Sequence, residues 1–377
     1  MKVKDFDLAI IGAGIIGATT AYLAHVSRPE WYIALLDRSF VGGGATHYSA
    51  ALDLPFGRTI RQRNMVSRSV SFYRDLKARY PELPIQDISF ALVAPAADVA
   101  EAAAGFIDAA LHPAGVHEWQ QVRLKYPDLT IPQGHAVMMG GNARYSASTQ
   151  LAIALIDKAR EDRNVECWEG TEVKHIEDNP CGHTLILGDG RRITAKRAVI
   201  ATGPWLTSGP GGAFSQAAGI RTKKVAAMHI DWCPPPDAPV VYFPAEDAFL
   251  LPLYEQKKLL LSFTAQEWDC SAEISRLRIK ADDRTLALSI LNRYCPALTK
   301  HCSGGRVFCD AYSLDRAPFV ARISNLHSPV VAGGSSGSGV RLAPAIALEA
   351  LELFDISASP EKTLYEKSIG TGASTHS

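Results

Sequence analysis

The fold is decided by one stretch near the N-terminus, Asp7–Gly17, which reads DLAIIGAGIIG. Its first five residues form a short apolar run that predicts a buried strand, and residues 18–26 have a helical pattern. Three glycines separate the two. Gly12 permits a tight turn, Gly14 lets the backbone approach a ligand closely, and Gly17 allows the helix to pack against the strand.

An acid follows at the spacing that a dinucleotide site requires. Tyr32–Leu36 predicts a second buried strand, and Asp37 at its end lies 20 residues after Gly17. A carboxylate there accepts hydrogen bonds from ribose hydroxyls and repels a 2′-phosphate, which disfavours NADP. The N-terminus of the intervening helix attracts a pyrophosphate. The pattern therefore predicts a Rossmann-type site for FAD or NAD, because both use this motif; an ordinary glycine turn is the structural alternative.

Composition restricts the classes of function. The chain has 377 residues, of which 47% are hydrophobic, enough for about two domains with large cores. Its formal net charge is zero, so we expect no nucleic-acid partner. We also expect no membrane span, because no apolar run reaches about 18 residues, and no secretory signal in the N-terminal MKVKDFD. These features predict a cytoplasmic protein, and they leave its oligomeric state open.

The cysteines show no organised pattern. The chain has seven, at Cys167, Cys181, Cys233, Cys270, Cys295, Cys302 and Cys309, and none forms a CxxC pair. Their odd number and irregular spacing favour free thiols in a reducing compartment over a disulfide framework or a zinc site. We therefore expect no bound metal.

A second architecture follows this βαβ start. Residues 223–264 alternate short apolar runs with turns, which is typical of an antiparallel sheet. Apolar spacing predicts helices over 64–80, 149–163 and 271–292, and a last helix from Pro344 to about Leu353. Because the two architectures interleave along the chain, we expect domains that are discontinuous in sequence.

Three glycine-containing segments lie further along the chain: Gly42–Ala51 (GGGATHYSAA), Ala201–Trp205 (ATGPW) and Gly334–Pro344 (GSSGSGVRLAP). In this order they resemble the GxSS/GAS…NAG, AxGxWS and GFSGHGFKxAP motifs of the D-amino-acid oxidase superfamily, which includes the glycine and sarcosine oxidases. Tyr312–Pro318 and Thr171–Val173 are similar to two further segments of that family. The resemblance spans nearly the whole chain and implies FAD as the cofactor.

The resemblance also implies a fold class. We expect α/β plus α+β, with a Rossmann-type FAD-binding domain interleaved with a substrate domain built on a mixed or antiparallel sheet. The FAD-binding domain is expected over residues 1–80, 145–215 and 305–370, the substrate-binding domain over 81–144 and 216–304, and a flexible tail over 371–377.

FAD is expected to bind without a covalent link, although Cys309 lies near the cysteine that carries flavin in sarcosine oxidases. Glycines in the last segment remove side chains where backbone passes close to a flat ring, and free N–H groups there suit the electron-rich edge of a reduced flavin. The residues expected to contact FAD are Gly12, Gly14, Ile16, Gly17, Asp37, Arg38, Gly44, Ala45, Thr46, Ser49, Ala50, Val173, Thr202, Gly203, Trp205, Gly337, Gly339, Val340, Arg341 and Leu342.

Oxidation of an amine by flavin depends on positioning more than on acid–base groups, because hydride leaves the α-carbon of a neutral amine. A substrate carboxylate needs a fixed cation, and Arg341 falls where the sarcosine-oxidase pattern has a carboxylate-binding lysine. Tyr242, Tyr254 and His47 are further candidates for the catalytic pocket. The structural alternatives are an ion-paired or surface arginine, packed tyrosines and a structural histidine.

Two positions depart from the family pattern. Asp310 stands where glycine and D-amino-acid oxidases usually have an arginine, five residues before the Asp that matches Asp315. Leu260 stands where sarcosine oxidases have a lysine that helps to activate oxygen. We expect oxidation of a small-molecule amino acid or N-substituted glycine with O2 as the acceptor. A dehydrogenase with another acceptor and a non-catalytic nucleotide-binding protein are the alternatives.

Overall fold

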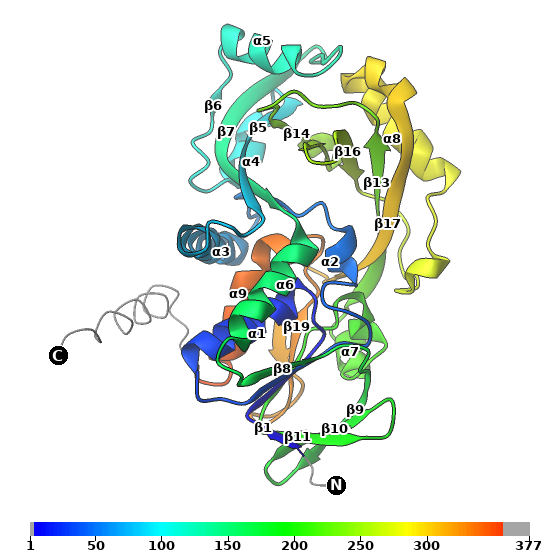
Figure 1. The fold of residues 1–377 in the computed structure, drawn as a ribbon. Coiled ribbons are helices and arrows are strands. Elements are labelled where there is room, and N and C mark those ends of the chain that lie inside the picture. Colours follow the sequence, from blue (N-terminus) through cyan, green and yellow to red (C-terminus); the bar gives the residue numbers. More distant parts are fainter. Residues whose placement is uncertain (1–3, 357–377) are drawn as a thin grey trace, which may run out of the picture.

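The structure, a computed structural model, describes residues 4–356, which form three sheets (Figure 1). The first sheet contains, in spatial order, β18 (Phe319–Arg322), β19 (Val330–Gly333), β12 (Ala198–Ile200), β2 (Leu8–Ile11), β3 (Ile33–Leu36) and β8 (Val165–Trp168). Its neighbouring strands are parallel, except that β18 pairs antiparallel with β19. The central strand β2 is apolar and buried at every residue, as expected for a strand covered on both faces.

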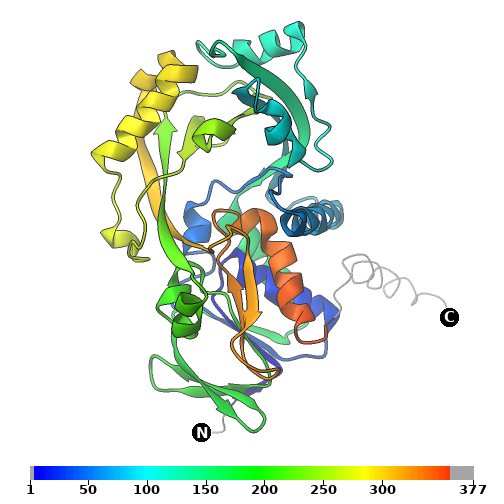
Figure 2. The same cartoon turned by 180° about the vertical axis from the view of Figure 1, so that it is seen from behind.

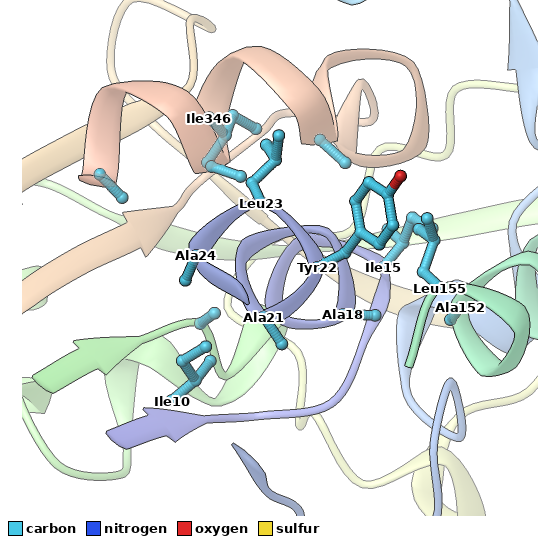
Figure 3. Close-up of a cluster of buried hydrophobic side chains, with 14 of the residues drawn as sticks. Ile10, Ile15, Ala18, Ala21, Tyr22, Leu23, Ala24, Ala152, Leu155 and Ile346 are labelled. Atoms are coloured by element: carbon cyan, nitrogen blue, oxygen red, sulfur yellow. The ribbon is translucent and has the colours of Figure 1, made fainter. Parts of the chain in front are cut away.

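Helix α1 (Ile15–Ser27) packs against this sheet and against α6 (Ser148–Arg160) and α9 (Gly339–Glu352), and α9 also contacts α3 (Ile60–Arg79). Small residues allow these close approaches. Figure 3 shows Ala21 of α1 pointing toward Ile10 of β2, and Leu23 pointing toward Ile346 of α9. All four of these side chains are buried, and each Å² of apolar surface so removed from water contributes roughly 25 cal/mol.

The second sheet is larger and has nine strands. In spatial order it contains β17 (Cys302–Tyr312), β13 (Arg221–Ile230), β16 (Lys258–Phe263), β15 (Ala248–Leu253), β14 (Val240–Phe243), β5 (Ile85–Pro95), β7 (His135–Ser146) and β4 (Leu52–Asp53), with β6 (His112–Pro113) beside β7. Neighbours are antiparallel except β14 and β5. Helix α8 (Ala281–Tyr294) packs against one face. Figures 1 and 2 show this sheet above the first one, with β13 and β17 reaching down toward it.

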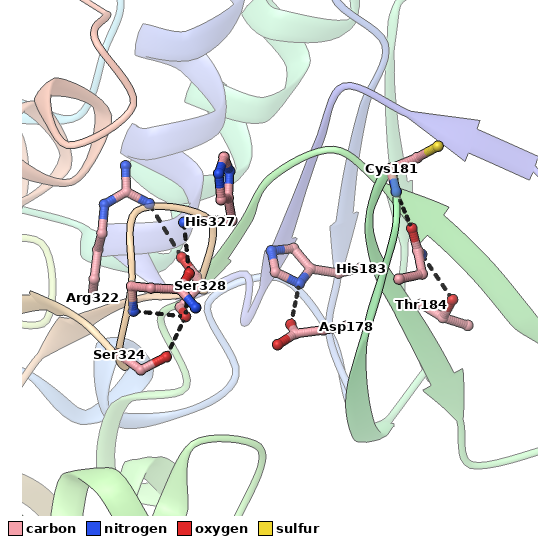
Figure 4. A network of polar contacts seen from close by, with 10 residues as sticks. Asp178, Cys181, His183, Thr184, Arg322, Ser324, His327 and Ser328 are labelled. Atoms are coloured by element: carbon pink, nitrogen blue, oxygen red, sulfur yellow. Dashed lines mark hydrogen bonds and ion pairs between the residues drawn. The ribbon is translucent and has the colours of Figure 1, made fainter.

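A third sheet contains β1 (Lys4–Phe6), β11 (Arg192–Ala195), β10 (Gly182–Leu187) and β9 (Val173–Asn179). Polar contacts fix its hairpin and the neighbouring β18–β19 loop (Figure 4). His183 of β10 bonds Asp178 of β9 at 3.0 Å. In the loop, Arg322 donates to the Ser328 carbonyl at 3.2 Å, and the Ser324 and Ser328 hydroxyls are 2.6 Å apart.

The remaining helices are short. They are α2 (Ala45–Tyr48), α4 (Val99–Ala104), α5 (Val116–Leu124), α7 (Gly212–Ala217) and 3-10 turns at Gly203–Thr207, Pro244–Glu246, Ile274–Arg276 and Pro296–His301. Between residues 4 and 356, none of the helices has the length and apolar character needed to cross a bilayer.

The fold class predicted from the sequence is confirmed. Three predicted helix starts are wrong by four residues or more. Helix α3 begins at Ile60 rather than 64, where Thr59 and Gln62 form a capping box. Helix α8 begins at Ala281 rather than 271, where Asp283 accepts the N–H of Lys280 at 2.7 Å and caps the first turn. Helix α9 begins at Gly339, before Pro344. The division into discontinuous domains stays a prediction, and the tail over 371–377 lies outside the described residues.

The early start of α9 places Pro344 inside a helix, where it cannot donate to the carbonyl four residues before it. That carbonyl belongs to Val340, and the hydroxyl of Tyr73 on α3 donates to it at 2.6 Å. Tyr73 is only 4% exposed, so this carbonyl would be buried and unpaired without the hydroxyl. The contact lets α9 continue through a proline and start at the cavity described below.

We expect Tyr73→Phe to lower the free energy of unfolding by about 1–3 kcal/mol, because it leaves the buried Val340 carbonyl without a donor. Urea unfolding measures the change. In a Pro344→Ala background the new backbone N–H can reach that carbonyl, so Tyr73→Phe should cost clearly less there. Equal losses in the two backgrounds would show that the hydroxyl does not replace the missing helical bond.

Candidate cofactor and substrate site

A cavity of about 640 Å³ is lined by residues of both large sheets. Gly12 and Asp37 enter its wall where the parallel strands β2 and β3 end, which is where ligands bind in open α/β sheets. Tyr242 and Phe308 enter it from the nine-stranded sheet. Its size falls in the range of small-molecule pockets, roughly 300–1,000 Å³.

The glycine turn after β2 is too tightly packed for any other residue. Gly12 has a φ of +103°, and a Cβ atom on it would lie 2.4 Å from the Ala201 carbonyl oxygen. A Cβ on Gly17 would lie 1.8 Å from the Gly12 carbonyl oxygen. The close approach brings the start of α1 and the segment after β12 to the same part of the cavity.

Polar groups beside this turn fit a dinucleotide. Asp37 accepts the N–H groups of Ala13 and Ser39, one on each carboxylate oxygen and both at 2.8 Å, which leaves lone pairs for ribose hydroxyls. Burial raises the pKa of Asp37, and the two backbone bonds oppose that shift. Thr202 also lines the cavity, and its buried hydroxyl has no hydrogen-bond partner in the described protein. A ligand in the cavity would satisfy it.

Two helices begin at the cavity, and the side chain of the N-cap residue caps neither of them. Helix α1 starts after Gly14 and α9 after Ser338, and both residues are in the lining. In α1 the Thr46 hydroxyl accepts the Ile15 N–H at 3.0 Å, and the other N–H groups of the first turn have no helical partner. Such N-termini carry a partial positive charge. These residues therefore fit FAD: α1 would hold the pyrophosphate, and α9 would face the electron-rich edge of the flavin.

Three residues in the cavity wall, Arg38, Trp205 and Glu273, contact one another. The Arg38 guanidinium lies 4.2 Å from the Trp205 ring centroid. Glu273 Oε1 accepts hydrogen bonds from Arg38 at 2.8 Å and from the Trp205 indole at 3.0 Å, and the Arg38 bond lowers the pKa of Glu273. Glu273 lies before α8, so the irregular segment there is attached to the dinucleotide half of the molecule.

Arg341 lies in the cavity wall on the first turn of α9. It donates to the carbonyls of Leu54 (3.2 Å) and Phe56, and to the Ser338 hydroxyl at 2.7 Å. Burial lowers the pKa of Arg341, and the nearby Asp53 opposes that shift. Three of the five guanidinium N–H groups are thus used to fix the side chain, and the others remain for a ligand.

Asp310 of β17 lies in the same cavity. Its two oxygens accept the N–H groups of Gly337 at 2.9 Å and of Ala311 at 2.8 Å. Burial raises the pKa of Asp310, and the two backbone bonds oppose it. The carboxylate therefore connects the nine-stranded sheet to the glycine loop before α9.

Most of the predicted site residues line the cavity, and four do not. Those in its lining are Gly12, Gly14, Ile16, Asp37, Arg38, Gly44, Ala45, Thr46, Ser49, Ala50, Val173, Thr202, Gly203, Trp205, Tyr242, Gly337, Gly339, Val340 and Arg341. Gly17 and Leu342 lie outside the lining, Leu342 being buried in the core. His47 is exposed on α2, with Thr149 Oγ1 3.4 Å away. Tyr254 is also outside, with its hydroxyl donating to a backbone carbonyl at 2.5 Å.

Sequence reasoning did not identify the wall that β13 and β17 form. Alternate residues of β17 line the cavity, namely Arg306, Phe308, Asp310 and Tyr312, and Lys223 of β13 lies opposite Asp310 in the ladder. Period-two alternation is the signal of a strand with one face toward the cavity. It was present in the sequence RVFCDAY but was not recognised as a strand.

Comparisons with known proteins show which family and which solved structures this chain resembles. The family model described as "FAD dependent oxidoreductase" matches residues 7–353. No curated protein matches the sequence. Similar solved structures include glycine oxidase from Geobacillus kaustophilus (17% identity, 93% of this chain and 95% of that chain, TM-score 0.76), L-proline dehydrogenase from P. horikoshii (17%, 98% and 99%, 0.77) and L-α-glycerophosphate oxidase from Mycoplasma pneumoniae (16%, 93% and 95%, 0.75).

At these identities the structural neighbours share the fold, and their names cover different donors and acceptors. The family match carries more weight, because it runs from β2 through α9 and so includes both the glycine turn and the helix that carries Arg341. With a cavity whose open polar groups fit FAD, the chain belongs to the FAD dependent oxidoreductase family.

Proposed function

We propose that this enzyme oxidises the C–N bond of a small amino acid or N-substituted glycine. Bound FAD would take the hydride from the α-carbon at N5, water would hydrolyse the resulting imine, and O2 would be reduced to H2O2 as the cofactor is reoxidised. The observation that carries the proposal is the buried guanidinium of Arg341 in the cavity wall.

Arg341 is suited to hold a substrate carboxylate. Hydrogen bonds to the Leu54 and Phe56 carbonyls already fix the side chain of Arg341. Little further conformational entropy is therefore lost when a ligand binds to it. A carboxylate would supply the negative charge that a buried guanidinium lacks, in a planar two-point contact. The amine and its α-carbon would then be fixed relative to the cavity, which is the main contribution that this reaction asks of the protein.

Asp310 favours a substituted amine over a simple D-amino acid. An arginine at this position would provide a second fixed cation, whereas the carboxylate of Asp310 is held by Gly337 and Ala311 on the same side of the cavity. Its acceptor oxygens suit an N–H donor, so a secondary amine could be oriented between Asp310 and Arg341. We therefore place N-substituted glycines first among the substrates.

A dehydrogenase is the second candidate, and Leu260 favours it. Leu260 is fully buried in an apolar cluster with Val240 and Leu251, so no cation stands at that position to promote reaction with oxygen. The two candidates differ in one measurable product, because an oxidase forms peroxide in step with substrate loss and a dehydrogenase needs an added dye or quinone.

The purified enzyme should contain FAD, and that FAD should be bleached anaerobically by glycines with an N-substituent faster than by glycine, D-Ala or D-Pro. The reason is that Arg341 can bind the glycine carboxylate while Asp310 offers an acceptor for the amine N–H. The measurement is stopped-flow absorbance in the visible flavin bands, followed by a peroxide assay in air. Bleaching by none of these amines would remove the amine assignment.

Arg341→Ala should weaken transition-state binding of carboxylate-bearing amines by about 2–5 kcal/mol, as expected when one partner of a buried charge pair is removed. Steady-state kcat/KM for an N-alkylglycine measures this. The matched substrate is the same amine without its carboxylate, for which kcat/KM should change little. FAD content and thermal stability control for misfolding. An equal loss for both substrates would make Arg341 a structural residue only.

A further inference from the structure

A further cation, Arg306 of β17, faces the cavity, and no acid among residues 4–356 pairs with it. Arg306 lines the cavity, and its Nε is buried without a hydrogen bond. Burial lowers the pKa of Arg306 to about 10, and no acid opposes that shift. Arg306 is therefore a partly buried guanidinium whose charge is not balanced by an acid.

The acids nearest in the wall are engaged elsewhere. Asp310, four residues after Arg306 on the same face of β17, accepts two backbone N–H groups. Asp247 accepts the Thr264 hydroxyl at 2.6 Å. The titratable group that responds to Arg306 is His229 of β13, whose pKa falls through burial and then through the charge of Arg306. A histidine adds no negative charge.

An uncompensated buried charge is costly, and such groups are normally paired. At a cavity wall the missing anion can come from a ligand. Resting on the function proposed above, we propose that Arg306 forms an anion subsite, and that the N-substituent of the substrate carries a carboxylate or phosphonate for it. The substrate is thus a dianion with one acid at Arg341 and the other at Arg306.

The ladder register separates the two cations. Arg306 of β17 and Tyr242 of β14 stand on one row across the sheet, through Ala227, Ser262 and Phe249. Four strand spacings of about 4.8 Å put roughly 19 Å between the backbones at the two ends of this row. Arg341 lies at the Tyr242 end, because it donates to the carbonyls of Leu54 and Phe56, whose side chains pack in the same apolar cluster as Tyr242. The second acid must therefore sit on a spacer rather than beside the glycine carboxylate.

The test compares N-(ω-carboxyalkyl)glycines of one to four methylenes with their terminal amides, which match them in size and lack the second charge. A parallel series carries a terminal phosphonate. Dissociation constants come from the perturbation of the bound-flavin spectrum, and turnover is followed separately. Wild-type enzyme should bind the acid at least about 10-fold more tightly than the amide at one or more spacer lengths. The arm with the larger preference identifies the anion.

Arg306→Gln should abolish this preference by raising the dissociation constants of the acids about 10-fold, while those of the neutral amides change much less. Arg306→Lys should restore part of it. Arg221→Gln is the matched control, since Arg221 lies on β13 outside the cavity and pairs with Asp269 at the surface. This control removes one positive charge from the same sheet and should keep the full preference.

An absent acid preference at every spacer length in wild-type enzyme overturns the subsite. So does a preference that survives at the wild-type ratio in Arg306→Gln enzyme of unchanged FAD content. A different set of results would contradict the proposed function and leave the subsite standing. In that case no amine bleaches the flavin, yet the acids still bind more tightly than the amides and lose that advantage in Arg306→Gln.

Discussion

The close contact of the Gly12 turn with its neighbours is the constraint on which the rest of the structure depends. Any side chain at Gly12 or Gly17 would collide with a backbone carbonyl, of Ala201 in one case and of Gly12 in the other. Because both positions lack a side chain, α1 starts directly at the end of β2 and the segment after β12 lies beside it. That one approach brings Thr202, with its orphaned hydroxyl, and the start of α1 into the wall of the same cavity.

The elements that could be predicted from sequence are those set by local patterns. The first βαβ unit has apolar runs, glycines and an acid in fixed spacing, and the structure reproduces it. The starts of α8 and α9, which the sequence pattern misplaced, depend on distant partners. Helix α9 crosses Pro344 only because Tyr73 of α3 satisfies the Val340 carbonyl. The segment before α8 carries apolar residues at helical spacing, but Glu273 is bonded to Arg38 and Trp205 instead.

The same distinction applies to the cavity. The glycine segments could be assigned from the sequence because the local path of the backbone is what requires glycine there. The wall formed by β13 and β17 could not, since Lys223 comes to lie opposite Asp310 only when two strands far apart in sequence pair in one register. The role of Arg306 could not be predicted either, because the sequence RVFCDAY does not show that its guanidinium lacks an ion-pair partner. Such a property belongs to the assembled sheet rather than to the strand.

The Arg38–Trp205–Glu273 contact has a consequence for the life of the bound cofactor. Glu273 is on the irregular stretch ahead of α8, and its partners flank the dinucleotide turn. Dissociation of an FAD molecule that spans this wall would be coupled to breaking an exposed ion pair, which salt screens. Cofactor residence time would then shorten at high ionic strength, and saline washes rather than heat would offer the gentler route to apoprotein.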